Sequence, residues 1–306
     1  MPRSDNLTGA LLMMGSMAAF TINDAMIKGL SGQVPLFQVM FLRGVVTTIF
    51  VAVIAWRMGA LTRHLPREDW APVFWRMVGE IGSAYFFVSA LFNMPIANIS
   101  AIMQALPLTI TLAAALFFRE PVGWKRMSAI LAGFIGVMLI VRPGTEGFNV
   151  YSVYGLAAVA FVTLRDLATR KLSRDVPSML VTLITSFFIM VFFGLASLTG
   201  DWAPIDGRAM LLIGGAAVMI IGGYLFSIMV MRVGEISFVA PFRYTSLIWA
   251  LILGWVVFGD WPQTITLVGA AIVVASGLFT LYREAQVSRR ARAAQKRQFS
   301  LGPRPR

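Results

Sequence analysis

The sequence predicts an all-α integral membrane protein with ten transmembrane helices, arranged as two inverted five-helix repeats, with both termini in the cytoplasm. Three observations carry this prediction: an apolar composition, a series of long apolar stretches, and similar motifs that recur at a nearly constant offset. Of the 306 residues, 58% are hydrophobic and 13% charged, and the mean hydropathy is +0.77. Soluble domains have about 25% charged residues. The composition therefore excludes an ordinary soluble enzyme and a disordered or fibrous chain.

Long apolar stretches mark the expected spans, because a helix needs about 20 apolar residues to cross the hydrocarbon core. Prolines stand near the starts of several stretches, where a missing backbone N–H costs little. The connections are short, so neighbouring spans are expected to form antiparallel hairpins. The predicted spans cover residues 7–30, 35–57, 71–92, 95–118, 124–141, 151–171, 177–199, 209–231, 235–258 and 262–282.

Lysines and arginines in the loops predict the orientation. With the N-terminus in the cytoplasm, the outer side carries only Lys28, Arg142 and Arg208, and the inner loops and the tail carry most of the others. The net charge of +12 is then a topology signal, and it predicts no nucleic-acid partner. We expect a multi-pass protein of the bacterial cytoplasmic (inner) membrane, in contact with the lipid bilayer. Residues 285–306 are expected to form a basic, disordered cytoplasmic tail.

Two groups of motifs recur along the chain. Residues 96–120 (IANISAIMQALPLTITLAAALFFRE) align without a gap with residues 236–260 (ISFVAPFRYTSLIWALILGWVVFGD) at an offset of 140. The residues Thr21, Asp24, Lys28 and Pro35 match Thr163, Asp166, Arg170 and Pro177 at an offset of 142. The predicted repeats are residues 1–143 and 144–284. Since five spans is an odd number, the second repeat enters the membrane inverted, as in many secondary transporters.

Several of these motifs resemble a known family. FFREPVGW after the fourth span, FGDWPQT after the ninth, and the glycine-punctuated spans that follow resemble the EamA branch of the drug/metabolite transporter (DMT) superfamily. INDAMIKGL in the first span and FLRG in the second are similar to members that transport S-adenosylmethionine or riboflavin. The resemblance covers about residues 7–283. It implies a cavity lined mainly by spans 1–4 and 6–9, with spans 5 and 10 peripheral, and it leaves the substrate open.

Eight ionisable residues fall inside the predicted spans, where a charge costs about 2.5–3.5 kcal/mol on insertion scales. They are Asp24, Lys28, Arg43, Arg76, Glu80, Arg165, Asp166 and Arg243. Asp24 and Lys28 are four residues apart and share a helix face, and Asp166 with Arg170 repeats the pattern. We expect gating or ion-pair roles for a set of six. This set is Asp24, Lys28, Arg76, Arg165, Asp166 and Arg170. The alternative is a set of structural ion pairs that orient the helices.

Arg43 and Arg243 have no acidic residue within reach on their own helices, so each needs a distant partner or a ligand. A guanidinium group matches a carboxylate or phosphate in a bidentate way. Polar and aromatic residues accompany a helix-bending proline in the fourth and ninth spans. The predicted substrate-binding residues are Arg43, Glu80, Asn98, Gln104, Arg243, Tyr244 and Trp249. Core packing is the alternative for the two aromatic residues. The eight intramembrane charges carry a surplus of two positive charges, which favours an acid-bearing or zwitterionic ligand.

These observations predict a secondary transporter that moves a small organic metabolite by alternating access. An amino-acid derivative or an S-adenosylmethionine-like compound is the preferred substrate. Riboflavin or another flat aromatic metabolite is an alternative, and a membrane-embedded enzyme is a further one. The chain has no cysteine, one histidine, no HExxH and no Walker loop, so we expect no catalytic residue, no metal and no cofactor.

The sequence allows alternatives for the energy coupling, the helix packing and the direction of transport. Asp24 and Glu80 are candidates for proton coupling, with exchange and facilitated diffusion as alternatives. Small-residue stripes at Ala129/Gly133 and Ala271/Ala275 either pack the two halves together or form a homodimer. The direction of transport depends on gradients.

Overall fold

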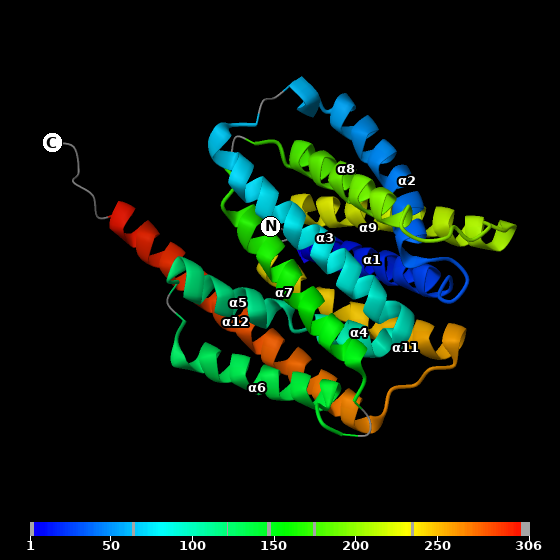
Figure 1. Cartoon of the computed structure of the whole chain (residues 1–306). Coiled ribbons are helices and arrows are strands. Elements are labelled where there is room, and N and C mark those ends of the chain that lie inside the picture. The colour runs from blue at the N-terminus through cyan, green and yellow to red at the C-terminus, as the bar shows by residue number, and fades with distance from the viewer. Residues whose placement is uncertain are drawn as a thin grey trace.

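The protein is described from a computed structural model, which covers residues 3–62, 65–120, 122–145, 148–173, 176–233 and 236–300. All regular elements in these ranges are helices (Figure 1). The α-helices are α1 (Arg3–Lys28), α2 (Leu36–Arg57), α3 (Trp70–Asn93), α4 (Ile96–Met103), α5 (Leu106–Phe118), α6 (Trp124–Val141), α7 (Val150–Arg170), α8 (Ser178–Ser197), α9 (Gly207–Val233), α10 (Ile236–Val239), α11 (Thr245–Phe258) and α12 (Thr264–Ser300). The short 3-10 helices are η1 (Ala60–Thr62), η2 (Arg67–Asp69) and η3 (Ala240–Tyr244).

The helices form one bundle with four extensive pairings. Helix α1 packs on α9, α3 on α7, α2 on α8, and α6 on α12. The α2–α8 pair and the α6–α12 pair lie on opposite sides of the bundle, and α1, α3, α7 and α9 lie between them (Figure 1). Helices α6 and α12 correspond to the fifth and tenth predicted spans. Both lie at one edge of the bundle (Figure 1).

Among the described residues, nine helical segments are long and apolar enough to cross a membrane. Helix α3 has 24 residues but is not among the nine. It carries Arg76 and Glu80, which lower its apolarity. The nine segments agree with nine of the ten predicted spans, and the third predicted span, residues 71–92, stays a prediction. Exposed tryptophans gather near both ends of the bundle, as interfacial residues do. They are Trp56, Trp70, Trp75 and Trp124 at one end and Trp202, Trp255 and Trp261 at the other.

The fourth and ninth spans are interrupted near the middle of the bundle. The fourth changes from α4 to α5 at Gln104 and Ala105, and Pro107 lies in the first turn of α5. The ninth passes through η3, which holds Pro241 in its own first turn. Proline has no backbone N–H to donate, so it favours a break in the helix. The side chain of Gln104 reaches across to the ninth span, where its Nε2 donates to Ser246 Oγ at 2.8 Å.

Completely buried apolar side chains gather in the half of the bundle that contains Lys28, at the end of α1. Leu30, Leu91, Ile96 and Phe193 are completely buried there. They come from four separate segments and belong to one apolar cluster. We call this half the Lys28 end, and we call the opposite half, where α7 finishes, the Arg170 end. Two cavities lie toward the Arg170 end.

Glycines bring α6 and α12 together. A Cβ on Gly136 would lie 2.8 Å from the carbonyl oxygen of Gly269, and one on Gly269 would lie 2.6 Å from that of Gly136. Gly133, from the predicted stripe of α6, faces Leu108 and Ser276. Ala271 and Ala275 are exposed and lie away from this contact. The closest approach therefore uses a different face of α12 from the predicted stripe. A homodimer stays a prediction.

Helix α12 continues to Ser300 and projects from the bundle, where the sequence predicts a disordered tail from residue 285 (Figure 1). Alanine, arginine, lysine and glutamine dominate residues 290–298. These residues have high helix propensity. A long helix can therefore extend beyond the membrane-spanning segment.

Candidate functional site

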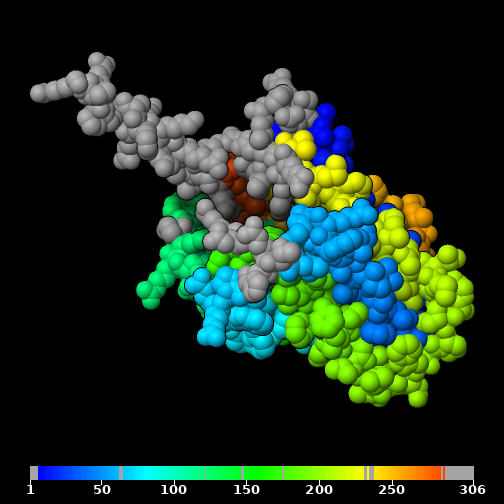
Figure 2. All heavy atoms as spheres, turned by 90° about the horizontal axis from the view of Figure 1, so that it is seen from above, coloured from blue at the N-terminus to red at the C-terminus, as the bar shows by residue number. Residues whose placement is uncertain are grey.

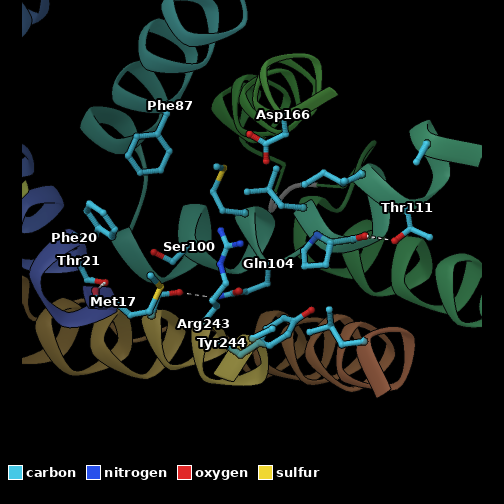
Figure 3. A pocket seen from close by; sticks show the side chains of 18 of the residues that line it. Met17, Phe20, Thr21, Phe87, Ser100, Gln104, Thr111, Asp166, Arg243 and Tyr244 are labelled. Atoms are coloured by element: carbon cyan, nitrogen blue, oxygen red, sulfur yellow. Dashed lines mark hydrogen bonds between the residues drawn. The ribbon is translucent and has the colours of Figure 1, made fainter. Parts of the chain in front are cut away.

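The larger cavity has a volume of about 520 Å³ and lies toward the Arg170 end. Its walls come from α1, α3, α4, α5, α7, η3 and α11, and the first turn of α6 and part of α12 also contribute (Figure 3). Seen from above, the molecule is hollowed so that dark red atoms of α12 show inside (Figure 2). The cavity lining comprises Met17, Phe20, Thr21, Asp24, Phe87, Ser100, Met103, Gln104, Leu106, Pro107, Ile110, Thr111, Ala114, Glu120, Arg126, Asp166, Arg170, Ala240, Arg243, Tyr244, Ser246 and Leu281.

Arg243 is the cation at the centre of this cavity. Its side chain rises from η3 into the space beside Ser100 and Gln104, and Asp166 points in from α7 on the opposite wall (Figure 3). Among the described residues, no carboxylate lies within 4.0 Å of the Arg243 guanidinium. Arg243 is exposed to the cavity, so its N–H donors are available to a ligand.

The charges on the cavity wall balance in number. Three carboxylates and three guanidinium groups line it, and the expected surplus of positive charge does not occur there. These groups are Asp24, Glu120 and Asp166, with Arg126, Arg170 and Arg243. The sequence prediction assumed that all eight intramembrane charges face one cavity, but only Asp24, Asp166 and Arg243 of that set face this one. A wall with both signs fits a zwitterionic ligand better than a simple anion.

Aromatic and amide groups complete the cavity. Phe20, Phe87 and Tyr244 contribute rings, which can stack on a flat ligand (Figure 3). The hydroxyl of Tyr244 is buried and has no hydrogen-bond partner among the described residues. The Gln104 amide is held by Ser246, so it presents its carbonyl oxygen in a fixed orientation.

A second cavity of about 300 Å³ lies between α2, α3, α8 and α9. Arg43, Arg76 and Glu80, all predicted as site or gating residues, line this cavity instead of the larger one. The structure therefore separates Arg43 and Glu80 from the other predicted substrate-binding residues. Tyr224 also lines this cavity, and it carries no charge or motif that marks it in the sequence.

A polar wall divides the two cavities. Arg165 donates from Nε to Asp166 Oδ1 at 2.9 Å and from Nη1 to Glu80 Oε1 at 3.5 Å. It therefore joins one carboxylate of each cavity. Nearby, the Asn23 amide donates to Asp24 Oδ1 at 2.9 Å, and the Asn23 carbonyl oxygen accepts from Arg43 at 3.4 Å. Asn23 is buried, and sequence spacing alone does not single it out.

The predicted i,i+4 pairs do not form; each cation finds a distant partner instead. The Lys28 ammonium donates to the carbonyl oxygens of Leu91 at 3.1 Å and Met94 at 2.7 Å, and it lies 5.4 Å from the centre of the Phe258 ring. A guanidinium nitrogen of Arg170 lies 2.7 Å from Glu120 Oε1. Long cationic side chains can reach other segments of the chain. A spacing of four residues on one helix permits an ion pair but does not require one.

Arg170 also lies 5.4 Å from the centre of the Phe118 ring. The two clusters, Arg170–Phe118–Glu120 and Lys28–Phe258–Asp260, are equivalent in the sequence alignment. Asp260 acts electrostatically on Lys28. Similar contacts therefore occur at opposite ends of the bundle.

Asn98 and Trp249 line neither of the two cavities. They lie in α4 and α11, which pack against each other. The Asn98 Oδ1 and Trp249 Nε1 atoms are buried and have no hydrogen-bond partner among the described residues. Their predicted role in substrate binding is therefore not supported by proximity to a cavity.

Gly277 of α12 leaves room for Tyr244, because an added Cβ would overlap the Tyr244 hydroxyl. Gly277→Ala is expected to push the Tyr244 ring into the larger cavity and to reduce substrate affinity about tenfold or more, a cost of about 1–3 kcal/mol typical of overpacking. Ligand affinity and thermal unfolding of the purified variant measure this. Gly214→Ala is the matched control, since its Cβ would meet no atom within 4 Å.

Adding Tyr244→Phe to Gly277→Ala removes the overlapping hydroxyl and should recover part of the lost affinity. An unchanged affinity in Gly277→Ala would show that Tyr244 does not shape the site.

The EamA-like transporter family model matches the chain twice, over residues 7–142 and 150–282. The chain is 34% identical to a riboflavin transporter of Vibrio cholerae over 214 residues, which cover 69% of this chain and 71% of that protein. It is 25% identical to an S-adenosylmethionine uptake transporter of Rickettsia felis over 295 residues, covering 94% and 97%. A pseudopaline exporter, CntI, of Pseudomonas aeruginosa is 22% identical over 276 residues, covering 88% and 94%.

A solved crystal structure has a similar fold. It superposes with a TM-score of 0.60 and 19% sequence identity, over 89% of this chain and 96% of the other. At this identity, the similarity concerns the fold alone.

Proposed function

Because this chain belongs to the EamA-like transporter family, we propose that it moves a zwitterionic organic metabolite across the membrane through the larger cavity. It is a multi-pass protein of the bacterial inner membrane, and its named relatives are transporters rather than enzymes. The observation that carries the substrate class is the unpaired guanidinium of Arg243, which faces the carboxylate of Asp166 across the cavity (Figure 3). A ligand that bears both signs could engage both groups.

The size and the lining of the larger cavity indicate which zwitterionic metabolites could fit. About 520 Å³ is within the 300–1,000 Å³ range typical of sites for drug-sized ligands. Phe20, Phe87 and Tyr244 can stack on a flat ring. S-adenosylmethionine combines an adenine ring with an amino-acid group, and the Rickettsia relative named for its uptake aligns over 94% of this chain. We therefore propose an S-adenosylmethionine-like compound as the substrate.

Riboflavin is the second candidate. The Vibrio cholerae relative that is named for riboflavin transport is 34% identical, and the three rings would suit an isoalloxazine. Riboflavin is neutral and would bring no negative charge to the Arg243 guanidinium. The S-adenosylmethionine-like compound has a carboxylate for this group and is therefore preferred. The two candidates differ in their expected dependence on Arg243.

We propose that the halves form inverted repeats that exchange arrangements. Swapping the halves pairs the first span with the sixth, the third with the eighth, and so on. The α1–α9 contact then maps onto α7–α3, and the α2–α8 and α6–α12 contacts map onto themselves. The family model also matches the two halves separately. These facts support alternating access, in which two related halves expose one site to each side in turn.

The cation clusters at the two ends are the proposed gates. Lys28 holds the end of α3 beside Phe258, and Arg170 holds Glu120 beside Phe118. The Lys28 end is densely packed, and the larger cavity extends to Arg170 at the other end. In the predicted orientation, the larger cavity extends toward the cytoplasmic side as far as Arg170, and the Lys28 cluster closes the outer side. Proton coupling through Asp24, which lines the cavity, stays a proposal.

Uptake into proteoliposomes tests the substrate assignment. Vesicles loaded with unlabelled S-adenosylmethionine should accumulate the labelled compound by exchange, and riboflavin at the same concentration should compete weakly. Arg208→Gln serves as a control because Arg208 is exposed on α9 and lines neither of the two cavities. Transport of riboflavin alone would replace the zwitterion with the second candidate, and transport of neither would reject both.

A further inference from the structure

The second cavity collects buried polar atoms that have no partner. It has a volume of about 300 Å³ and is lined by α2, α3, α8 and α9. Among the described residues, Thr48 Oγ1, Arg76 Nε and Glu80 Oε2 are buried without a hydrogen-bond partner, and all three residues line it. An unpaired polar group in an apolar interior is costly, so such atoms indicate a ligand-binding role.

Two guanidinium groups on this cavity have donors to spare. Arg43 has only a 3.4 Å contact with Asn23 Oδ1 and a 3.5 Å contact with the Met40 sulfur. Among the described residues, no carboxylate lies within 4.0 Å of Arg43 or Arg76. With the free hydroxyl of Thr48, they form a donor set. Guanidinium and hydroxyl donors together match a carboxylate ligand.

The cavity also offers one acceptor. Glu80 uses Oε1 for Arg165 at 3.5 Å and leaves Oε2 free. A free carboxylate oxygen beside two guanidinium groups would accept from an ammonium group on the same ligand. The phenol of Tyr224 is the remaining ionisable group on this lining. The donors and the acceptor therefore call for a ligand that carries both a carboxylate and an ammonium group.

The remaining wall is mixed: Ser178, Thr182, Thr185 and Ser186 of α8 add hydroxyl groups, and another part is aliphatic. Ile54, Ile189, Ile220 and Leu225 form the aliphatic part. At about 300 Å³, the cavity is at the small end of ligand sites. It suits a compact molecule with an aliphatic side chain.

We propose that the second cavity is a binding site for a free amino acid with an aliphatic side chain. The carboxylate of the amino acid binds Arg43, Arg76 and Thr48, its ammonium group binds Glu80 Oε2, and its side chain lies against the isoleucines. This site is distinct from the larger cavity, and it goes beyond the proposed function, because neither Arg243 nor Asp166 takes part.

The test is binding of L-leucine to the purified full-length chain, followed by isothermal titration calorimetry and thermal unfolding. Acetate and methylamine are half-ligands, each carrying one of the two charges. We expect saturable L-leucine binding and at least tenfold weaker binding of either half-ligand. Arg76→Gln and Glu80→Gln should each raise the Kd for L-leucine at least tenfold, since hydrogen bonds to charged groups are strong.

Thr48→Val keeps the shape of the side chain and should raise the Kd severalfold. Its matched control is Thr280→Val on α12, since Thr280 is buried, lines neither of the two cavities, and its hydroxyl already donates to the Ser276 carbonyl oxygen at 2.9 Å. Thr280→Val should leave the Kd within about twofold. The pair keeps the test valid if an arginine variant does not fold.

Three outcomes would overturn this proposal: no L-leucine binding, equal binding in Thr48→Val and Thr280→Val, or binding that persists in Arg76→Gln and Glu80→Gln. Binding of phosphatidylserine nanodiscs without any binding of L-leucine would assign the cavity to a lipid headgroup, which also overturns it. Transport of S-adenosylmethionine is measured separately. Leucine binding without transport would reject the proposed function alone, and transport without leucine binding would reject this site alone.

Discussion

Replacing Arg243 with glutamine is expected to weaken substrate binding about 10- to 150-fold and to leave thermal stability nearly unchanged. Truncating a charged hydrogen-bond donor typically costs about 1.5–3 kcal/mol when its acceptor is in the ligand. Arg243 has no ion-pair partner within the described part of the chain, so its loss breaks no ion pair in the folded protein. Isothermal titration of S-adenosylmethionine against the purified variant measures the affinity.

The conservative variant Arg243→Lys separates charge from shape. It keeps the positive charge but loses the bidentate fork, so we expect an intermediate affinity. The Arg208→Gln control should bind as the unmodified protein does. If Arg243→Gln leaves the affinity for a zwitterion unchanged, the substrate does not contact this guanidinium group, and the neutral candidate riboflavin gains support.

Replacing Lys28 with methionine is expected to open the Lys28 end of the bundle. The Lys28 ammonium group donates to the carbonyl oxygens of Leu91 and Met94, which lie at the C-terminal end of α3. Hydrogen bonds to charged groups are each worth about 1.5–3 kcal/mol. Removing the ammonium group also removes the cost of desolvating it, which offsets part of this loss. The population of the open state should therefore rise about 10- to 100-fold.

Cysteine labelling measures the opening. The chain contains no cysteine, so Ser89→Cys, at a buried position of α3, provides a single reporter. Maleimide labelling of the reporter in detergent should be about 10- to 100-fold faster with Lys28→Met. The matched control is Lys125→Met, since Lys125 also lies over an aromatic ring, that of Trp124, but at the start of α6. Equal labelling rates in both variants would mean that Lys28 does not hold the gate.

Much of the fold followed from the sequence because lipid leaves few choices to the backbone. Without water to satisfy N–H and C=O groups, an apolar stretch of about 20 residues has to form a helix. Nine spans could be recognised this way. The sequence also predicts the third span, residues 71–92, but helix α3 is not among these nine because Arg76 and Glu80 reduce its hydropathy. Helix α12 extends beyond residue 285, where the charge of the sequence favours a disordered tail and its alanine, arginine, lysine and glutamine content favours a helix.

The site was harder to predict. Gln104, Tyr244 and Arg243 could be found because each lies near a proline-containing break, and a break in a span exposes backbone and side chains to a cavity. Trp249 and Asn98 lie near the same breaks in the sequence, but neither lines one of the two cavities. Periodicity within one helix does not reveal which neighbour a side chain faces.

The sequence by itself determined that this protein spans a membrane, that its chain has two similar halves, and which charges lie within the spans. Those properties depend on local hydrophobicity and on motif spacing. Only the tertiary structure decided the partners of those charges: Lys28 binds carbonyl oxygens more than 60 residues away, and Arg43 and Arg243 face different cavities. The physical reason is that a long charged side chain can reach several partners, and the packing of neighbouring helices selects one of them.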